Sequence, residues 1–169
     1  GIELQGRWQP AQWFNATGNL AFSRNKVKNF VAWYDDYDDG SQKSESYDET
    51  DISFSPSVTG GAVISFIPLQ NWEISFLSKY AGKQYLDNTS NEARKLDAFY
   101  VQDFRTIYTL NKLLFSEINL VLQVNNLFSK KYEPNGYTYS YISGGALVNE
   151  NYYFPMAGRN FMIGVNVKL

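Results

Sequence analysis

The chain has 169 residues, enough for one domain, and its 15 basic and 17 acidic side chains give a formal net charge of -2. This balance excludes a protein that binds nucleic acid through its charge. The sequence holds no cysteine and no histidine, which excludes disulfides, imidazole metal sites and the catalytic triads that use either residue. Aromatic residues make up 17% of a chain whose mean hydropathy is only -0.38, a mixture that favours strands.

Apolar and polar residues alternate at period two in segment after segment, which predicts strands with one apolar face. No apolar stretch approaches the roughly 20 residues that a membrane-spanning helix needs. The expected strands are, in chain order, 2–9, 13–23, 57–66, 72–80, 103–110, 118–125 and 160–169.

The connections between these strands alternate in length. Short turns are expected at 10–11, 68–71 and 111–116, and long polar loops at 35–52, 85–97 and 131–156. In an antiparallel meander alternate connections lie at the same end, so one end has tight turns and the other has large loops. Outer-membrane β-barrels have this asymmetry. The sequence therefore predicts an all-β, antiparallel up-and-down meander of about seven strands, in a transmembrane β-barrel.

A soluble β-sandwich is the alternative, because period two does not tell whether an apolar face meets a protein core or lipid. Aromatic residues near the strand ends favour the barrel, since they form girdles at membrane interfaces: Trp8, Trp13, Trp33, Tyr34, Trp72, Tyr80, Phe99, Tyr100 and Tyr132. Large polar residues on the opposite faces suit a wet lumen, and the lumen-facing candidates are Glu73, Lys79, Asp103, Arg105, Gln123 and Asn125.

Asp103 and Arg105 share a strand face, and Glu73 and Lys79 are expected to join them from a neighbouring strand. Two carboxylates could hydrolyse a glycoside, but nothing in the sequence places a pair around a cleft. We therefore expect charge pairs that stabilise the barrel interior, and no enzyme. Gly60-Gly61 and Gly144-Gly145 lack the context of a phosphate-binding loop and predict close packing or turns.

The segment Tyr34 to Asp51 holds eight acidic residues and one lysine. An EF-hand with Gly40 at its sixth position would need oxygen ligands at its third and twelfth, where Tyr37 and Ser46 stand, so this motif is excluded. A solvated, mobile loop is the preferred interpretation, and loose capture of a divalent cation or a cationic ligand is the alternative.

The loop 132–155 combines aromatic rings with amides that could contact a sugar or a planar chelate. The candidate ligand contacts are Tyr137, Tyr139, Tyr141, Asn151 and Tyr152. The same rings could instead pack the loop on itself or serve in a girdle.

Two motifs near the end of the chain resemble a known family. The run Val124-Asn125-Asn126-Leu127-Phe128-Ser129-Lys130-Lys131-Tyr132 is similar to an N-N-L-F-x-K-x-Y segment, and Pro155 to Phe161 is similar to P-x-x-G-R-x-F. Both are found near the C-terminus of TonB-dependent outer-membrane receptors, and Trp72 to Asp87 also resembles that family. The resemblance implies a plugged barrel of about 22 strands that imports iron chelates, cobalamin or glycans across the bacterial outer membrane.

On this resemblance, residues 1–169 are the C-terminal part of such a barrel, a fragment without the plug domain and the TonB-binding segment. The implied partners are outer-membrane lipid, the barrel-assembly machinery, a nutrient ligand, and the TonB complex only through the missing N-terminal part. We expect no cofactor and no nucleic acid. Unpaired edge strands of a fragment invite self-association. The rival interpretation is a secreted carbohydrate-binding β-sandwich.

The last strand is expected to span the bilayer, close the barrel and act as the assembly strand. Its apolar face consists of Phe161, Ile163, Val165, Val167 and Leu169. Its other face consists of Met162, Gly164, Asn166 and Lys168, which suit the lumen. The family usually ends in an aromatic residue, and this chain ends in Leu169.

Overall fold

The computed structural model describes residues 1–111 and 116–168, and these residues form strands, turns and irregular segments without a helix. These described residues therefore contain no helix that is long and apolar enough to cross a membrane.

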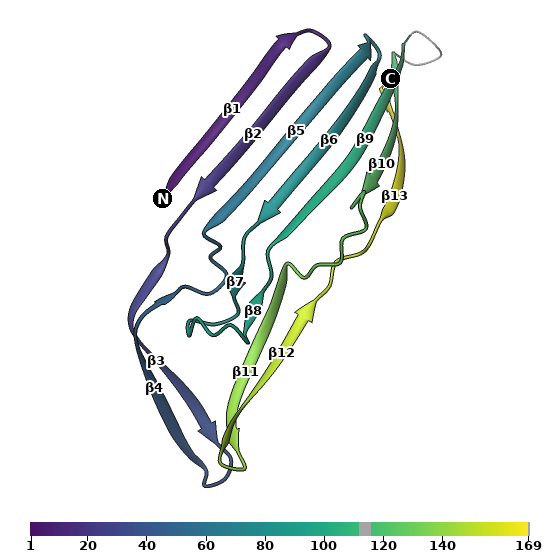
Figure 1. Cartoon of the computed structure of the whole chain (residues 1–169). Helices are drawn as coiled ribbons and strands as arrows, with labels where there is room; N and C mark the ends of the chain where they lie inside the picture. Colours follow the sequence, from purple (N-terminus) through teal and green to yellow (C-terminus); the bar gives the residue numbers. More distant parts are fainter. Residues whose placement is uncertain (112–115, 169) are drawn as a thin grey trace.

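A seven-stranded antiparallel sheet is the main element (Figure 1). Each strand lies beside the preceding one of the set, which confirms the predicted up-and-down meander of seven strands. In sheet order the strands are β1 (Ile2–Ala11), β2 (Phe14–Phe22), β5 (Val58–Leu69), β6 (Trp72–Ala81), β9 (Phe99–Asn111), β10 (Glu117–Asn125) and β13 (Asn160–Lys168).

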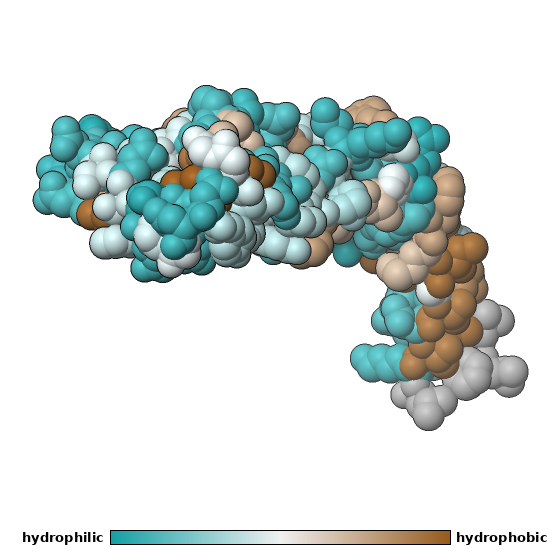
Figure 2. Space-filling view, turned by 90° about the horizontal axis from the view of Figure 1, so that it is seen from below, coloured by the Kyte–Doolittle hydropathy of each residue, from teal (hydrophilic) through white to brown (hydrophobic). Residues whose placement is uncertain are grey.

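The register of the sheet aligns its apolar residues on one face. Phe14 lies opposite Phe66 with ring centroids 5.3 Å apart, and Phe76 lies opposite Phe104 at 5.5 Å. The face ends on β13, where the Ile163 side chain is 81% exposed. Figure 2 shows hydrophobic residues gathered along one side of the arm at one end of the bent molecule, with hydrophilic residues on the other side of the same arm.

Two hairpins extend beyond one end of this sheet and form a four-stranded sheet of their own (Figure 1). They are β3 (Lys26–Asp36) with β4 (Ser41–Asp51), and β11 (Asn135–Ser143) with β12 (Ala146–Phe154). The order is β12-β11-β3-β4, and β11 pairs with β3 in parallel.

The expectation of loops at 35–52 and 131–156 is wrong. Because β4 is polar on both faces, its sequence lacks the alternation that reveals a strand, and backbone pairing with β3 forms it instead.

The third expected loop, 85–97, is largely irregular. The short strands β7 (Gln84–Tyr85) and β8 (Lys95–Leu96) lie at its two ends and pair with each other between the two hairpins. At its base Ala81, Phe99 and Val101 form a small core, and the Phe99 ring lies 4.5 Å from that of Tyr132.

Some expected boundaries and exposures are corrected. Pro10 and Ala11 belong to β1, and the turn follows at 12–13. Phe99 and Tyr34 are only 4% and 6% exposed, so neither belongs to a surface girdle. The Phe99 ring packs against Tyr132, and the ring of Tyr34 in β3 lies beside Arg94. The expected turn at 111–116 lies largely outside the described residues, and Leu169 lies outside them.

Candidate functional site

The register places all six predicted polar residues on the face opposite the apolar one. In the register Lys79 lies opposite Val101, and Arg105 lies opposite both Ser75 and Gln123. Residues that lie opposite one another point to the same face of the sheet, so these side chains share the polar face. The structure thus places the predicted lumen-facing residues on one face of the sheet, and these are Glu73, Lys79, Asp103, Arg105, Gln123 and Asn125.

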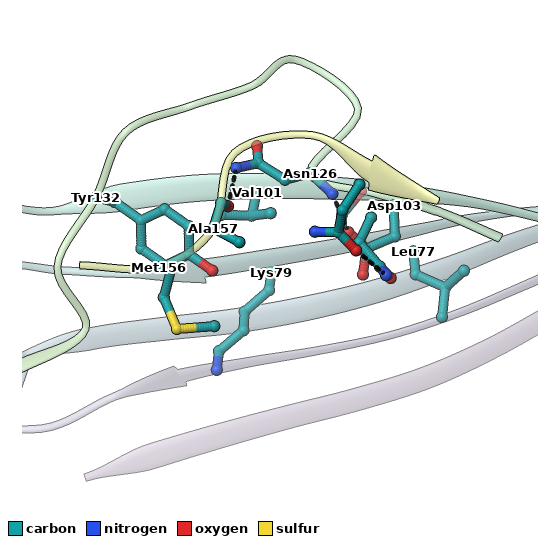
Figure 3. Close-up of a pocket in the computed structure, with 11 residues that line it drawn as sticks. Leu77, Lys79, Val101, Asp103, Asn126, Tyr132, Met156 and Ala157 are labelled. Carbon is teal, nitrogen blue, oxygen red and sulfur yellow. Dashed lines mark hydrogen bonds between the residues drawn. The ribbon is translucent and has the colours of Figure 1, made fainter. Parts of the chain in front are cut away.

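A cavity of about 410 Å³ opens on this polar face (Figure 3). Lys79, Asp103 and Asn125 line it from the sheet, and Tyr132 and Met156 line it from the segments that lead to and from the second hairpin. Burial, and after it the negative charge of Asp103, raises the pKa of the Tyr132 hydroxyl. The cavity has a mixed lining, because Leu77 and Val101 lie beside Lys79 and Asp103 on the sheet side.

The expected charge pairs do not form. The Glu73 carboxylate accepts hydrogen bonds from Ser65 Oγ at 3.1 Å and Ser75 Oγ at 2.7 Å. Asp103 accepts one from a backbone N–H. Among the described residues no ion pair includes Glu73, Lys79, Asp103 or Arg105. Hydrogen bonds from two serine hydroxyls to Glu73, and from the Asn126 backbone N–H to Asp103, stand in place of the expected ion pairs.

Asn126 joins the two sequence motifs. This residue is 4% exposed and has a φ of 50°, the left-handed conformation in which asparagine is favoured. Its Nδ2 donates to the carbonyls of Lys130 (2.8 Å) and Ala157 (3.1 Å), and its Oδ1 accepts from the Lys130 N–H. Arg159 Nε adds a bond to the carbonyl of Leu127 at 2.9 Å. The motifs therefore hold the start of the second hairpin to the start of β13.

The turns of the two hairpins are clasped together. The carboxylate of Asp38 accepts the backbone N–H groups of Gly145 (2.7 Å) and Gly144 (2.8 Å). Both glycines have positive φ, 71° and 62°, which aims consecutive N–H groups at one anion and confirms their prediction as turn glycines. These two bonds, that of Gly145 first, lower the pKa of Asp38. A hydrogen bond between the Tyr37 and Tyr139 hydroxyls joins the first turn to β11.

The predicted ligand-contact residues divide between the two faces of the second hairpin. Tyr137, Tyr139, Tyr141 and Tyr152 lie on one face, where the rings of Tyr137 and Tyr152 stack at 4.8 Å. Asn151 pairs with Thr138 on the other face, and its Nδ2 donates to the Ala93 carbonyl at 2.7 Å.

Glu150 organises the tyrosine face. Its carboxylate accepts hydrogen bonds from the hydroxyls of Tyr152 (2.6 Å) and Tyr141 (2.9 Å), which lower its pKa. The four tyrosines of the predicted set therefore share one surface, which Asn151 does not join.

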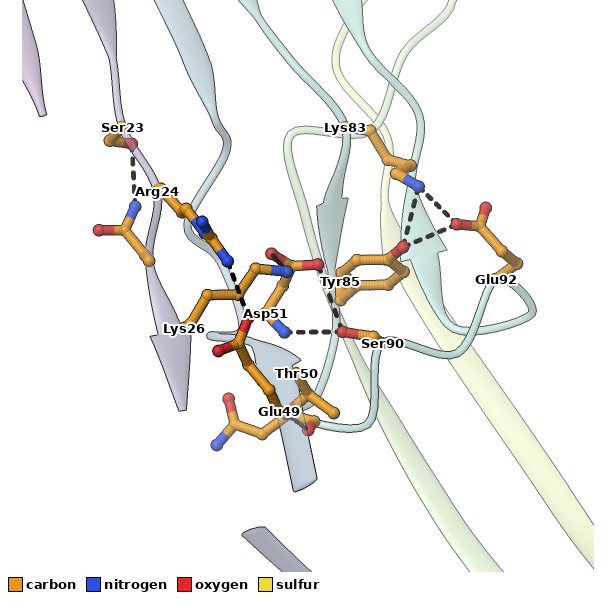
Figure 4. A network of polar contacts seen from close by, with 12 residues as sticks. Ser23, Arg24, Lys26, Glu49, Thr50, Asp51, Lys83, Tyr85, Ser90 and Glu92 are labelled. Atoms are coloured by element: carbon orange, nitrogen blue, oxygen red, sulfur yellow. Dashed lines mark hydrogen bonds and ion pairs between the residues drawn. The ribbon is translucent and has the colours of Figure 1, made fainter. Parts of the chain in front are cut away.

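The segment between β7 and β8 is tied to the first hairpin by a polar network (Figure 4). Ser90 Oγ accepts the backbone N–H of Asp51 at 2.7 Å, and Lys26 forms an ion pair with that carboxylate at 2.7 Å. On the other side of the segment Lys83, Tyr85 and Lys95 donate to Glu92, and these bonds lower its pKa to about 2.

Arg94 is the buried centre of this segment, and the sequence analysis missed it. Its side chain is 2% exposed, donates to Asp87 at 2.6 Å and lies over the ring of Tyr34 at 5.8 Å. A single arginine in a polar stretch carries no periodic signal that distinguishes it from a surface residue. Within 1–111 and 116–168, no group of three or more carboxylates is arranged to hold a metal ion.

The fold is that of known receptor barrels. The chain is similar to the siderophore receptor PiuA of Acinetobacter baumannii, with a TM-score of 0.74 and 19% identity over 98% of this chain and 21% of that one. It is also similar to the ferric yersiniabactin uptake receptor FyuA of Yersinia pestis (TM-score 0.57, 17% identity, 98% and 22%) and to the ferric-catecholate import receptor Fiu of E. coli (0.53, 16%, 98% and 27%).

The chain has the fold of a section of a TonB-dependent receptor barrel, as its motifs indicated. It spans between about a fifth and a third of the length of the solved structures that it matches. No protein-family model and no curated protein matches the sequence.

Proposed function

We propose that residues 1–169 form the C-terminal part of the β-barrel of an outer-membrane receptor that imports a scarce nutrient. The observation that carries this proposal is the seven-stranded meander, apolar on one face and polar on the other, in the fold of receptor barrels. Of the nutrients that the family resemblance allows, an iron chelate is favoured, because the similar structures are named as receptors or transporters of siderophores or ferric chelates. The function is transport, without catalysis.

In this arrangement the apolar face meets lipid and the polar face with Lys79, Asp103 and Arg105 lines the lumen. Both hairpins and the segment 84–96 leave the sheet at the same end, which is the extracellular end on this proposal. The apolar face of β13 contacts lipid, and β13 is the strand that the assembly machinery recognises. Energy coupling to the TonB complex belongs to a segment outside these 169 residues.

The secreted β-sandwich is less well supported. A sandwich buries the apolar faces of two sheets against each other, whereas here the apolar side chains of β13, such as Phe161 at 68% and Ile163 at 81%, are exposed. Lipid would cover this face in an outer-membrane barrel.

Fractionation of cells that express the full-length product tests the proposal. We expect the protein in the outer-membrane fraction, in a form whose mobility on gels changes on heating. Recovery in the soluble periplasmic or secreted fraction would contradict import and favour the rival. Uptake of ferric chelates labelled with radioactive iron, in cells with and without the protein, then tests the nutrient class.

A further inference from the structure

The tyrosine face continues from the second hairpin onto β3. Tyr141 lies opposite Asp35 where β11 pairs with β3, so Asp35 and Trp33, two residues before it, share this face. Trp33 is 63% exposed and Asp35 is also exposed, whereas Tyr34 between them is buried against the other face. One side of the four-stranded sheet therefore presents a set of rings from three strands, and these are Trp33, Tyr137, Tyr139, Tyr141 and Tyr152.

The rings of this face are accessible to a partner. Tyr137, Tyr139 and Tyr152 are 43% to 50% exposed, although stacking and hydroxyl hydrogen bonds hold them in place. Exposed aromatic patches with polar neighbours are typical of interaction sites, where tyrosine and tryptophan are enriched. Rings that are already ordered also lose little conformational entropy on binding. The tyrosine face therefore has the composition and the order of an interface, and its charges define the chemistry of the partner.

The charge of the face is negative. Two carboxylates, Asp35 and Glu150, stand among the rings, and among the described residues neither forms an ion pair. The lysines of the hairpins belong to the opposite face, where Lys43 lies across from Tyr34. Together the hairpins, 26–51 and 135–154, hold three lysines and nine carboxylates, a net charge of -6. The complement of this face is therefore a cation.

Other classes of partner fit the face less well. An acidic protein or an anionic lipid headgroup would be repelled by both carboxylates. A neutral or apolar partner would cover Asp35 and Glu150 without supplying a counter-charge, which is costly. A guanidinium group matches both features of the face, because it stacks on an aromatic ring and donates hydrogen bonds to a carboxylate at the same time. Arginine is therefore the side chain that the face fits best.

The spacing of the two carboxylates requires more than one cation. Glu150 lies on β12 and Asp35 on β3, with β11 between them. Neighbouring strands are about 4.8 Å apart, so these two positions are about 10 Å apart across the sheet. One guanidinium cannot reach both carboxylates, whereas two arginines of one extended peptide can. At the first of them, Oδ1 of Asp35 accepts from Gln42 Nε2 at 2.8 Å, and Oδ2 is the acceptor that faces a ligand.

We infer that the tyrosine face binds a basic, arginine-bearing segment of a partner protein. One guanidinium stacks on Trp33 and donates to the Asp35 carboxylate. A second donates to Glu150, beside the stacked rings of Tyr137 and Tyr152. This inference goes beyond import of a nutrient and does not rest on it, because binding is measured on the purified protein wherever the protein acts in the cell.

Isothermal titration of the purified full-length protein in a nonionic detergent tests the inference. The probe is a synthetic peptide of alternating glycine and arginine, and its counterparts carry glutamine or glutamate in place of arginine. We expect only the arginine peptide to bind saturably, and its binding to weaken as salt is added. Trp33→Leu, which removes the ring, and Asp35→Asn, which removes the charge, should each weaken binding at least about threefold. The matched changes Trp13→Leu in the main sheet and Glu45→Gln on the other face of the hairpins should leave it unchanged.

Several results would overturn the inference. The first is the absence of saturable binding of the arginine peptide, and the second is equal binding of its glutamine counterpart. A loss in Glu45→Gln as large as that in Asp35→Asn would reduce the effect to general attraction by an acidic protein. Self-association of the wild type that Trp33→Leu abolishes would assign the face to a second copy instead. Because both substituted side chains are exposed, we expect circular dichroism identical to the wild type for each variant.

Discussion

The backbone N–H of Asn126 donates to Oδ1 of Asp103 at 2.7 Å, and this bond connects the motif after β10 to the polar face of β9. Asn126 is held in the left-handed conformation while its own side chain bonds Lys130 and Ala157. The most recognisable motif of the chain therefore has a structural role, at the point where the sheet gives way to the hairpin.

Replacing Asn126 by alanine should destabilise the protein by about 2–4 kcal/mol, because it removes the side-chain bonds and leaves a residue that disfavours positive φ. Unfolding in urea of the full-length protein in detergent measures this. Asn125→Ala, the neighbouring change, should cost about 1 kcal/mol or less. Equal losses would show that Asn126 is not the joint between the motifs.

Replacing Asp38 by alanine should release the clasp between the hairpin turns. Hydrogen exchange of the Gly144 and Gly145 amides should become faster, and protease cleavage of both turns should increase. Asp35→Ala, in the adjoining strand β3 and without a bond to either glycine, is the control. Unchanged exchange in Asp38→Ala would contradict the clasp.

The clasp should also depend on pH. Because the folded-state pKa of Asp38 lies below the ordinary 3.8, its stabilisation is fully present above that value and is lost as the pH falls through the lower, folded pKa. Exchange of the two glycine amides, corrected for intrinsic rates, should therefore rise only below about pH 4. A rise at neutral pH would contradict this assignment.

Replacing Arg94 by methionine should cost about 3–5 kcal/mol, because Asp87 loses its buried partner. The adjacent Lys95→Met removes only exposed ion pairs and should cost at most about 1 kcal/mol. Thermal unfolding compares the two, and adding Asp87→Asn to Arg94→Met should restore part of the loss. An equal effect at both positions would argue against Arg94 as the buried centre of the segment.

Val165→Lys places a charge on the apolar face of β13 and should cost about 2–4 kcal/mol in the membrane, whereas Asn166→Lys on the polar face should cost about 1 kcal/mol or less. Heat-modifiability on gels and surface assembly of the full-length protein measure the difference. Similar behaviour of the two variants would mean that the faces, and with them the barrel, are wrongly assigned.

The sequence by itself determined the main sheet, because successive side chains of a strand point to opposite faces. The alternation in Phe161, Ile163 and Val165 is therefore visible without any neighbour, and matching patterns in the other strands placed Glu73 and Arg105 on the shared polar face. Asn125-Asn126 and the glycine pair at 144–145 could also be singled out, since their conformations are local.

Tertiary structure alone decided the hairpins and what lies between them. Strand β4 is polar on both faces, so only its backbone pairing with β3 makes it a strand. The clasp joins residues 106 and 107 positions apart, and the buried Arg94 lies over the ring of Tyr34 from a different segment. Such contacts depend on how the chain returns on itself, and no periodicity encodes the partner of a single polar side chain.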